Sequence, residues 1–168
     1  MIDNSYVRTM ARYNAWQNDN LYQAAATLGD DTRRQDRGAF FGSIQGTFCH
    51  LLWADRMWLS RFAGTPKPSI PGAESASMIA LWDDLVAERR VTDTVISDWA
   101  AGLAPDWLSG DLTWLSGISR RELTRPRAQL VAHMFNHQTH HRGQVHAMLT
   151  AAGARPGDTD LMLIDLVD

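Results

Sequence analysis

The chain's histidines gather in one short segment, which reads His133-Met-Phe-Asn-His137-Gln-Thr-His140-His141-Arg-Gly-Gln-Val-His146. Three of them, His133, His137 and His141, repeat every four residues. On an α-helix, residues four apart lie on one face, about 40° apart around the axis and roughly 6 Å along it. Stacked imidazoles of this kind usually share a metal ion. The sixth histidine, His50, lies far upstream in another apolar segment, from which it could supply a further ligand.

The same segment carries the apolar stripe of a helix that we expect to run from about Pro126 to Ala152. The stripe has the alternating three- and four-residue spacing of a buried seam and consists of Leu130, Met134, His137, His141, Val145, Met148 and Ala152. A polar group in such a seam costs stability unless it is satisfied. A divalent metal satisfies adjacent neutral imidazoles, since each offers a lone pair. The alternative of histidines that are only hydrogen-bonded in the core stays open.

The other histidines of the segment point elsewhere. His140 lies about 100° from His141 around the axis, and His146 about 140°, so we expect both to face away from the seam. His133 lies only about 40° from His137 but one turn beyond a two-ligand site, which predicts a neighbour of the site rather than a ligand. The pair that faces the core is therefore His137 and His141, with His50 as the candidate third ligand.

Two known zinc motifs do not fit the segment. His-Glu-x-x-His uses its glutamate as the general base, and Gln138 stands at that position here. His-x-x-Glu-His has a glutamate where this chain has His140. Metalloprotease chemistry therefore lacks its base.

The rest of the chain predicts a four-helix bundle, an all-α fold in one domain over residues 1–168, with a short irregular or hairpin insertion before the last helix. The other helices are expected over about 4–28, 43–62 and 75–101, with a loop over 30–42 and a hairpin within 102–125. Thr124 is a candidate N-cap for the last helix, and Gly153 ends it. The inner side of the third helix is predicted from its apolar residues, Met78, Leu81, Trp82, Leu85, Val91 and Val95.

Composition narrows the classes of function. The 168 residues are 45% hydrophobic with a net charge of −3, and the 16 lysines and arginines are spread along the chain, which argues against nucleic acid as a partner. The one cysteine, Cys49, excludes an internal disulfide and favours a cytoplasmic setting. We expect neither a signal peptide nor a membrane span.

Four segments resemble the DinB/YfiT-like family of metal-dependent bundle proteins; they are residues 13–18 (Tyr-Asn-Ala-Trp-Gln-Asn), 50–58, 136–144 (Asn-His-Gln-Thr-His-His-Arg-Gly-Gln) and 156–161. The resemblance implies an up-down-down-up bundle whose metal is held by His50, His137 and His141. It also leads us to expect a homodimer. The family often has glutamate at the position of Gln138, so a role for that carboxylate is in doubt here.

The resemblance and the ligand set together suggest an activity. Three neutral ligands leave a divalent ion its full charge and an open coordination position, as in catalytic sites. Relatives include transferases and isomerases that use low-molecular-weight thiols, which favours activation of a thiol or water against a small-molecule electrophile, with thiol S-transfer first. The alternatives are a metal-dependent hydrolase and a non-catalytic metal- or ligand-binding, stress-related bundle. Zinc, nickel, iron(II) and manganese all suit three histidines.

Several polar and aromatic residues are secondary candidates. Arg142 either binds a substrate carboxylate or, more commonly, ties neighbouring helices together. Gln144 and Asn136 are placed to hydrogen-bond the outer nitrogens of ligand histidines, and Asn14 and Gln17 either do the same or are plain polar packing. Trp53 and Met57 either wall the pocket or, more commonly, fill the core. Further expectations are that Cys49 is not a ligand and that Gly143 permits a close helix approach.

Overall fold

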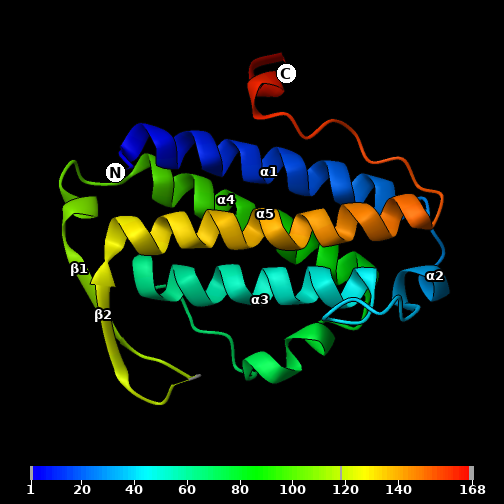
Figure 1. Ribbon diagram of the computed structural model, residues 1–168, viewed down its shortest axis with the longest axis horizontal. Helices are drawn as coiled ribbons and strands as arrows, with labels where there is room; N and C mark the ends of the chain where they lie inside the picture. Colours follow the sequence, from blue (N-terminus) through cyan, green and yellow to red (C-terminus); the bar gives the residue numbers. More distant parts are fainter. Residues whose placement is uncertain (1, 118, 167–168) are drawn as a thin grey trace.

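The computed structural model describes residues 2–117 and 119–166. Most of them are helical, with one small two-stranded sheet. Four long helices dominate (Figure 1): α1 (Asn4–Ala26), α3 (Ile44–Phe62), α4 (Trp82–Ala101) and α5 (Arg127–Ala151). The shorter ones are α2 (Asp30–Arg34) and the 3-10 helices η1 (Gly72–Ser77), η2 (Trp107–Ser109) and η3 (Leu161–Leu166). No helix in these described ranges is both long and apolar enough to cross a membrane.

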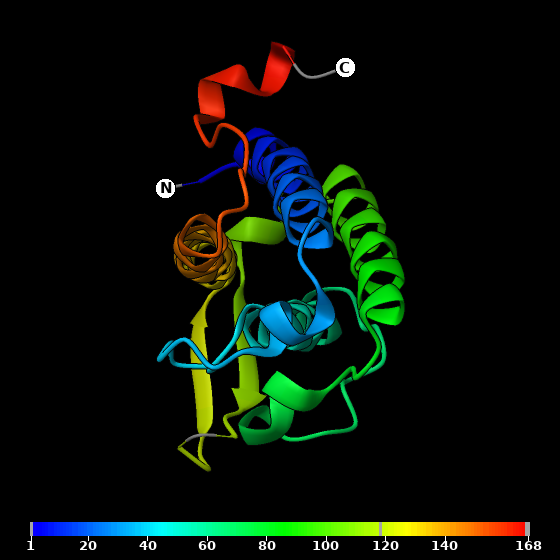
Figure 2. The same ribbon diagram turned by 90° about the vertical axis from the view of Figure 1, so that its right-hand side faces the viewer.

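The four long helices lie alongside one another. α1 packs against α4 and α5, and α3 packs against the same two helices from the other side, as the two views show (Figures 1 and 2). This arrangement is consistent with the predicted helical bundle. The up-down-down-up order of helix directions stays a prediction.

Local signals explain where the helices begin and end. The Ser43 side chain accepts a hydrogen bond from the backbone N–H of Gly46 (3.0 Å) and so caps α3, which ends at Phe62 as predicted. Gly153 has a φ of +84°, the left-handed conformation that terminates α5 at low cost. Asp3 caps α1 in the same way, by accepting from the N–H of Tyr6 (2.8 Å).

Three boundary predictions were wrong. The third long helix begins at Trp82 rather than at Ser75, because residues 72–77 form the separate helix η1 directly after Pro71. The predicted loop over 30–42 contains α2, whose Asp30 pairs with Arg34 one turn later (2.7 Å). Thr124 does not cap α5: it lies in a strand, where its hydroxyl bonds that of Thr113 (2.7 Å).

The predicted hairpin is present. β1 (Asp111–Leu115) pairs antiparallel with β2 (Glu122–Pro126), with Thr113 opposite Thr124. The hairpin stands at the end of the bundle where α5 begins (Figure 1).

The interior is divided along the bundle axis. One apolar cluster contains Leu21, Phe48, Leu85 and Leu149 near one end, and a second contains Val7, Phe62, Ile96 and Phe135 near the other. Many helix positions between the two clusters are buried and polar; among them are Asn14, Asn18, Asp55, Arg89, Thr92, Gln138, His141 and Arg142. We call these residues, together with the partly buried Asp93, the mid-bundle polar layer.

The polar layer corrects the predicted inner face of α4. Val91 was placed inside from its hydrophobicity, but it is 58% exposed. The buried side of α4 instead follows Leu85, Arg89, Thr92 and Ile96. A search for apolar periodicity assigns the wrong face when polar residues occupy the core positions.

Candidate metal centre

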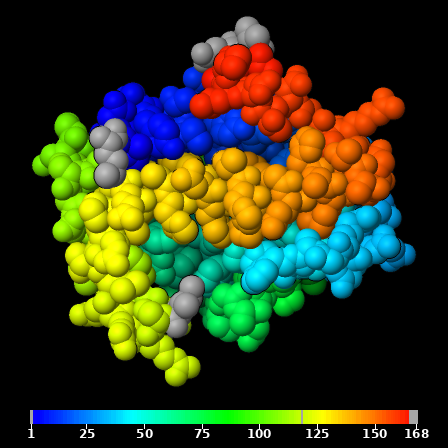
Figure 3. Space-filling view, in the orientation of Figure 1, coloured from blue at the N-terminus to red at the C-terminus, as the bar shows by residue number. Residues whose placement is uncertain are grey.

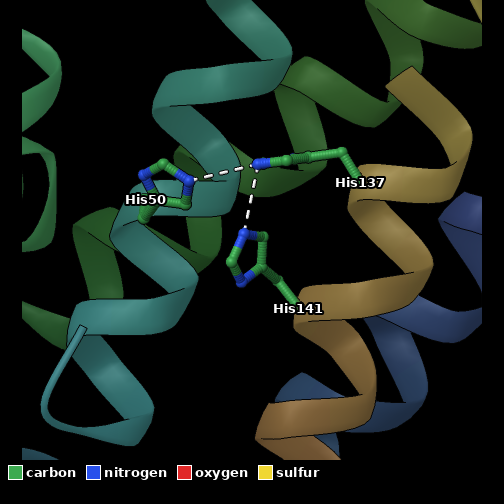
Figure 4. Close-up of side chains that lie close together, drawn as sticks. All are labelled: His50, His137 and His141. Carbon is green, nitrogen blue, oxygen red and sulfur yellow. Dashed lines mark hydrogen bonds between the residues drawn. The ribbon is translucent and has the colours of Figure 1, made fainter. Parts of the chain in front are cut away.

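The structure brings His50, His137 and His141 together between two helices. His50 projects from α3, and His137 and His141 project from successive turns of α5 (Figure 4). The Nε2 atom of His137 lies 3.3 Å from Nε2 of His50 and 3.1 Å from Nε2 of His141. One nitrogen from each ring lies within 4.8 Å of the other two.

The outer nitrogens of two rings fix which nitrogen carries the proton. The Ser75 hydroxyl donates to the carbonyl of Gly72 (2.6 Å), so its oxygen is left to accept from Nδ1 of His50 (2.9 Å). Nδ1 of His141 faces Oε1 of Gln144 (2.7 Å), which can only accept. Both rings therefore carry the proton on Nδ1, and both Nε2 atoms present lone pairs to His137.

These lone pairs suit a metal ion. Nε2 of His137 could donate a single proton to one of its two neighbours, which leaves the other pair of nitrogens in lone-pair contact. A tetrahedral ion with metal–nitrogen bonds of about 2.0–2.1 Å separates its ligand nitrogens by about 3.3 Å, close to the 3.3 and 3.1 Å between Nε2 of His137 and its two neighbours. The residues present thus fit a divalent cation.

The site keeps its imidazoles neutral. Burial, reinforced by the neighbouring His141, lowers the pKa of His50 to about 4. Burial also lowers the pKa of His137 to about 3, with His141 and His50 adding to the effect. The pKa of His141 is lowered by burial as well. Neutral imidazole is the form that binds metal, so these shifts favour a cation over protons near pH 7.

Aromatic rings enclose the His50 side of the site. Phe41 stacks on His50 with the ring centroids 3.7 Å apart and lies 5.3 Å from His141. Trp53 is nearly parallel to His50 at 6.2 Å, and its indole N–H donates to the carbonyl of Ile70 (3.0 Å). In the space-filling view, α3 forms the floor of a hollow framed by α5, the loop after α2, η1 and the hairpin (Figure 3).

The remaining histidines of α5 lie outside the triad. His133 is exposed, and its ring centroid is 5.9 Å from that of His137 and 5.3 Å from Trp58. His140 is exposed beside His141, and His146 is half-buried on a separate groove against α1. These placements agree with the helical angles worked out from the sequence.

The polar candidates divide into two groups. Gln144 binds an outer ring nitrogen, as predicted. Arg142 is buried and ties α5 to α1 by donating to Asn14, and Asn14 also donates to Asp93 (3.1 Å). Gln17 donates to the backbone carbonyl of Asp158 (2.9 Å). Asn14 and Gln17 are therefore structural contacts rather than supports of the triad.

Two further expectations are settled by the packing. Cys49 is buried with its thiol near the carbonyl of Ile79 (3.5 Å), away from the triad. Gly143 does not mediate a close helix approach: it is exposed, and an added Cβ would meet nothing within 4 Å.

Sequence reasoning missed two residues of the site. Ser75 holds His50 from η1, a segment expected to be the first turn of a helix. Phe41 lies in what was expected to be a plain loop. An aromatic pair, Phe40-Phe41, between two glycines was the one available signal, because exposed loops seldom need two large rings.

A model of the DinB family matches residues 1–166. The chain belongs to the DinB family. This DinB-family chain is also 26% identical to Protein DinB of Bacillus subtilis (strain 168) over 155 residues, which cover 88% of this chain and 87% of that protein. No solved structure gave a significant match. The family assignment confirms the resemblance carried by the four sequence segments.

Proposed function

We propose that this DinB-family protein binds a divalent metal ion through His50, His137 and His141 and uses it to activate a thiol or water against a small electrophilic substrate. The observation that carries the proposal is the convergence of three neutral imidazoles, two of which are locked with their lone pairs inward by Ser75 and Gln144. A bound divalent ion lowers the pKa of a water or thiol that it contacts by several units.

The chain's own residues orient the site and exclude solvent from one side. Ser75 and Gln144 hold the rings by hydrogen bonds to their outer nitrogens, contacts that raise ligand basicity and fix ring direction. Phe41 covers one face of His50 and keeps water from it. A substrate would approach a bound ion from the side away from Phe41.

His133 is the residue we assign to proton movement. Its ring lies next to that of His137, and partial burial of the imidazole together with the positive Arg61 lowers its pKa below the usual 6.5. It is thus neutral near pH 7 and able to accept a proton from a thiol or water held at the site. Gln138 cannot do so, because a side-chain amide is not basic; its N–H group donates to Asp55 instead (2.8 Å).

Thiol S-transfer is the form of the reaction that we favour, by analogy with thiol-using relatives of the family. Three neutral ligands leave the ion its full charge, which suits the binding of a soft anionic thiolate. A small-molecule substrate, a cytoplasmic location and a homodimer are parts of the same proposal.

The first test is metal content. Untagged protein should carry about one divalent ion per chain, and the His137→Ala/His141→Ala variant should carry almost none. A His140→Ala/His146→Ala variant is the matched control, since it removes two histidines from the same helix outside the triad. Equal metal content in wild type and the triad variant would overturn the site.

The second test is activity of the metal-loaded protein. Mycothiol, bacillithiol and glutathione are each offered with small electrophiles, and esters and amides are offered with water alone. Turnover that needs a thiol and is lost in His137→Ala supports S-transfer. Turnover with water alone indicates the hydrolase, and metal binding without turnover indicates a non-catalytic metal-binding protein.

A further inference from the structure

The mid-bundle polar layer forms a closed path of contacts through all four long helices. From α5, Gln138 donates to Oδ1 of Asp55 on α3 (2.8 Å), and Oδ2 of Asp55 accepts from Arg89 on α4 (2.6 Å). Arg89 also pairs with Asp93 one turn later (2.8 Å). Asp93 in turn contacts α1, and α1 contacts α5.

The return half of the path uses two asparagines. Asn14 and Asn18 of α1 donate to Oδ1 of Asp93 at 3.1 and 2.9 Å. Arg142 of α5 donates to Oδ1 of Asn14, which closes the path. Asn14, Asn18 and Arg142 are each at least 95% buried, so these contacts are shielded from competing water.

The layer lies at the level of the histidine triad. Gln138 is adjacent to His137 in sequence and precedes His141 by one turn, while Asp55 follows His50 on α3 by a little more than one turn. The Gln138–Asp55 hydrogen bond therefore joins the two helices that carry the three imidazoles, close to where the imidazoles meet.

Apolar packing alone does not fix the position of α5 along α3 well. Hydrophobic side chains in facing helices can exchange partners when one helix slides, whereas a buried hydrogen bond with defined donors and acceptors allows one register. A slip of α5 by one residue moves its side chains by 1.5 Å along the axis, far more than the few tenths of an ångström that metal ligands tolerate.

We infer that the Gln138–Asp55–Arg89 contacts of this layer are a positioning device that sets α5 against α3 and thereby holds His137 and His141 close enough to His50 for the three rings to share one metal ion. Gln138 is a positioning residue, since it acts through its neighbours and not on substrate. This inference rests on the proposed metal site for its role, but the geometry it claims exists in the metal-free protein.

The test compares Co²⁺ affinity in two variants of α5. Gln138→Met keeps the side-chain volume and removes the amide, and Val131→Ala is a control that destabilises the same helix within the apolar cluster beyond the layer. Gln138→Met should weaken Co²⁺ binding by about 10- to 100-fold and alter the visible ligand-field bands, as changes next to metal ligands do. Val131→Ala should bind Co²⁺ within about twofold of wild type despite its lower melting temperature.

A charge-neutral exchange provides the rescue. In Asp55→Asn/Gln138→Glu the asparagine amide can donate to the glutamate, so the α3–α5 hydrogen bond is rebuilt with its polarity reversed. We expect this double variant to bind Co²⁺ more tightly than Gln138→Met. Wild-type affinity in Gln138→Met, or an equal loss in Val131→Ala, would overturn the inference. A double variant that binds Co²⁺ no more tightly than Gln138→Met would also overturn it.

A metal-free readout separates this inference from the proposed function. Long-range ¹⁵N–¹H spectra of the histidine rings report which nitrogen carries the proton. We expect wild type to show His50 and His141 protonated on Nδ1, and Gln138→Met to show mixed tautomers at His141 or His50. If wild type binds no Co²⁺, the proposed function fails, while unchanged tautomers in Gln138→Met refute the positioning role.

Discussion

Arg89 is the cation that pairs with both aspartates of the polar layer, and the stability lost on its replacement by methionine can be estimated. Its guanidinium lies 2.6 Å from Asp55 and 2.8 Å from Asp93, with side-chain exposures of 4%, 2% and 12% respectively. Removing one partner of a buried ion pair leaves an uncompensated charge and typically costs about 3–5 kcal/mol. For a chain of this length, each kcal/mol shifts Tm by about 2–4 °C, so Arg89→Met should melt roughly 10 °C lower.

The loss should also depend on pH. Burial raises the pKa of Asp93, and Arg89 is the largest opposing influence, so Arg89→Met raises the pKa of that carboxyl further. A group whose pKa is raised by folding stabilises the fold below its unfolded value and loses that contribution as pH rises through its folded value. The gap between wild type and variant should therefore be larger at pH 7.5 than at pH 5.

Urea unfolding of metal-free protein at pH 7.5 and at pH 5 measures the difference in stability between wild type and Arg89→Met. The Arg89→Met/Asp93→Asn double variant should recover part of the loss, because it again leaves one buried cation, Arg142, and one buried anion, Asp55. A loss below about 1 kcal/mol at pH 7.5 would refute the reasoning, since it would mean that the pair contributes no more than an exposed one. A double variant less stable than Arg89→Met alone would do the same.

Two further predictions concern the triad. Folding lowers the pKa of His50 to about 4 and that of His137 to about 3, so metal-free protein should lose stability as pH falls from 6.5 towards 4. Unfolding titrations at several pH values measure how steeply the free energy of unfolding falls with pH. His137→Ala should make this dependence shallower by up to one proton, or about 1.4 kcal/mol per pH unit. An equal slope in His137→Ala contradicts the pKa assignment. Ser75→Ala removes the acceptor for Nδ1 of His50 and should weaken Zn²⁺ affinity about 10-fold in chelator competition, whereas Ser77→Ala, an exposed neighbour, should leave it unchanged.

The histidine helix could be predicted from the sequence because its information is local. Four-residue spacing alone places His137 and His141 on one face, and helix geometry alone sends His140 and His146 elsewhere. His50 could also be predicted as a ligand, because it is the one histidine outside that segment. Its partner Ser75 was not, since the contact depends on how η1 folds back over α3.

The four long helices were also predictable, but their inner faces were predictable only where those faces are apolar. The inner position one turn after Leu85 on α4 is Arg89, which a hydrophobic pattern places at the surface. On α1, Asn14 interrupts the stripe between Ala11 and Leu21 in the same way. Arg89 and Asn14 are each paired with an aspartate on another helix, and such pairing cannot be read from one helix at a time.

The charge balance of the polar layer accounts for the amide at position 138. Two cations, Arg89 and Arg142, face two anions, Asp55 and Asp93, so the buried layer is neutral as it stands. A glutamate at position 138, which the family resemblance leads one to expect, would add a third buried anion directly against Asp55. An amide fills the same volume and donates to that carboxylate instead. The residue that excludes protease-type base catalysis is therefore the residue that lets the helix bearing His137 and His141 dock on an acidic partner.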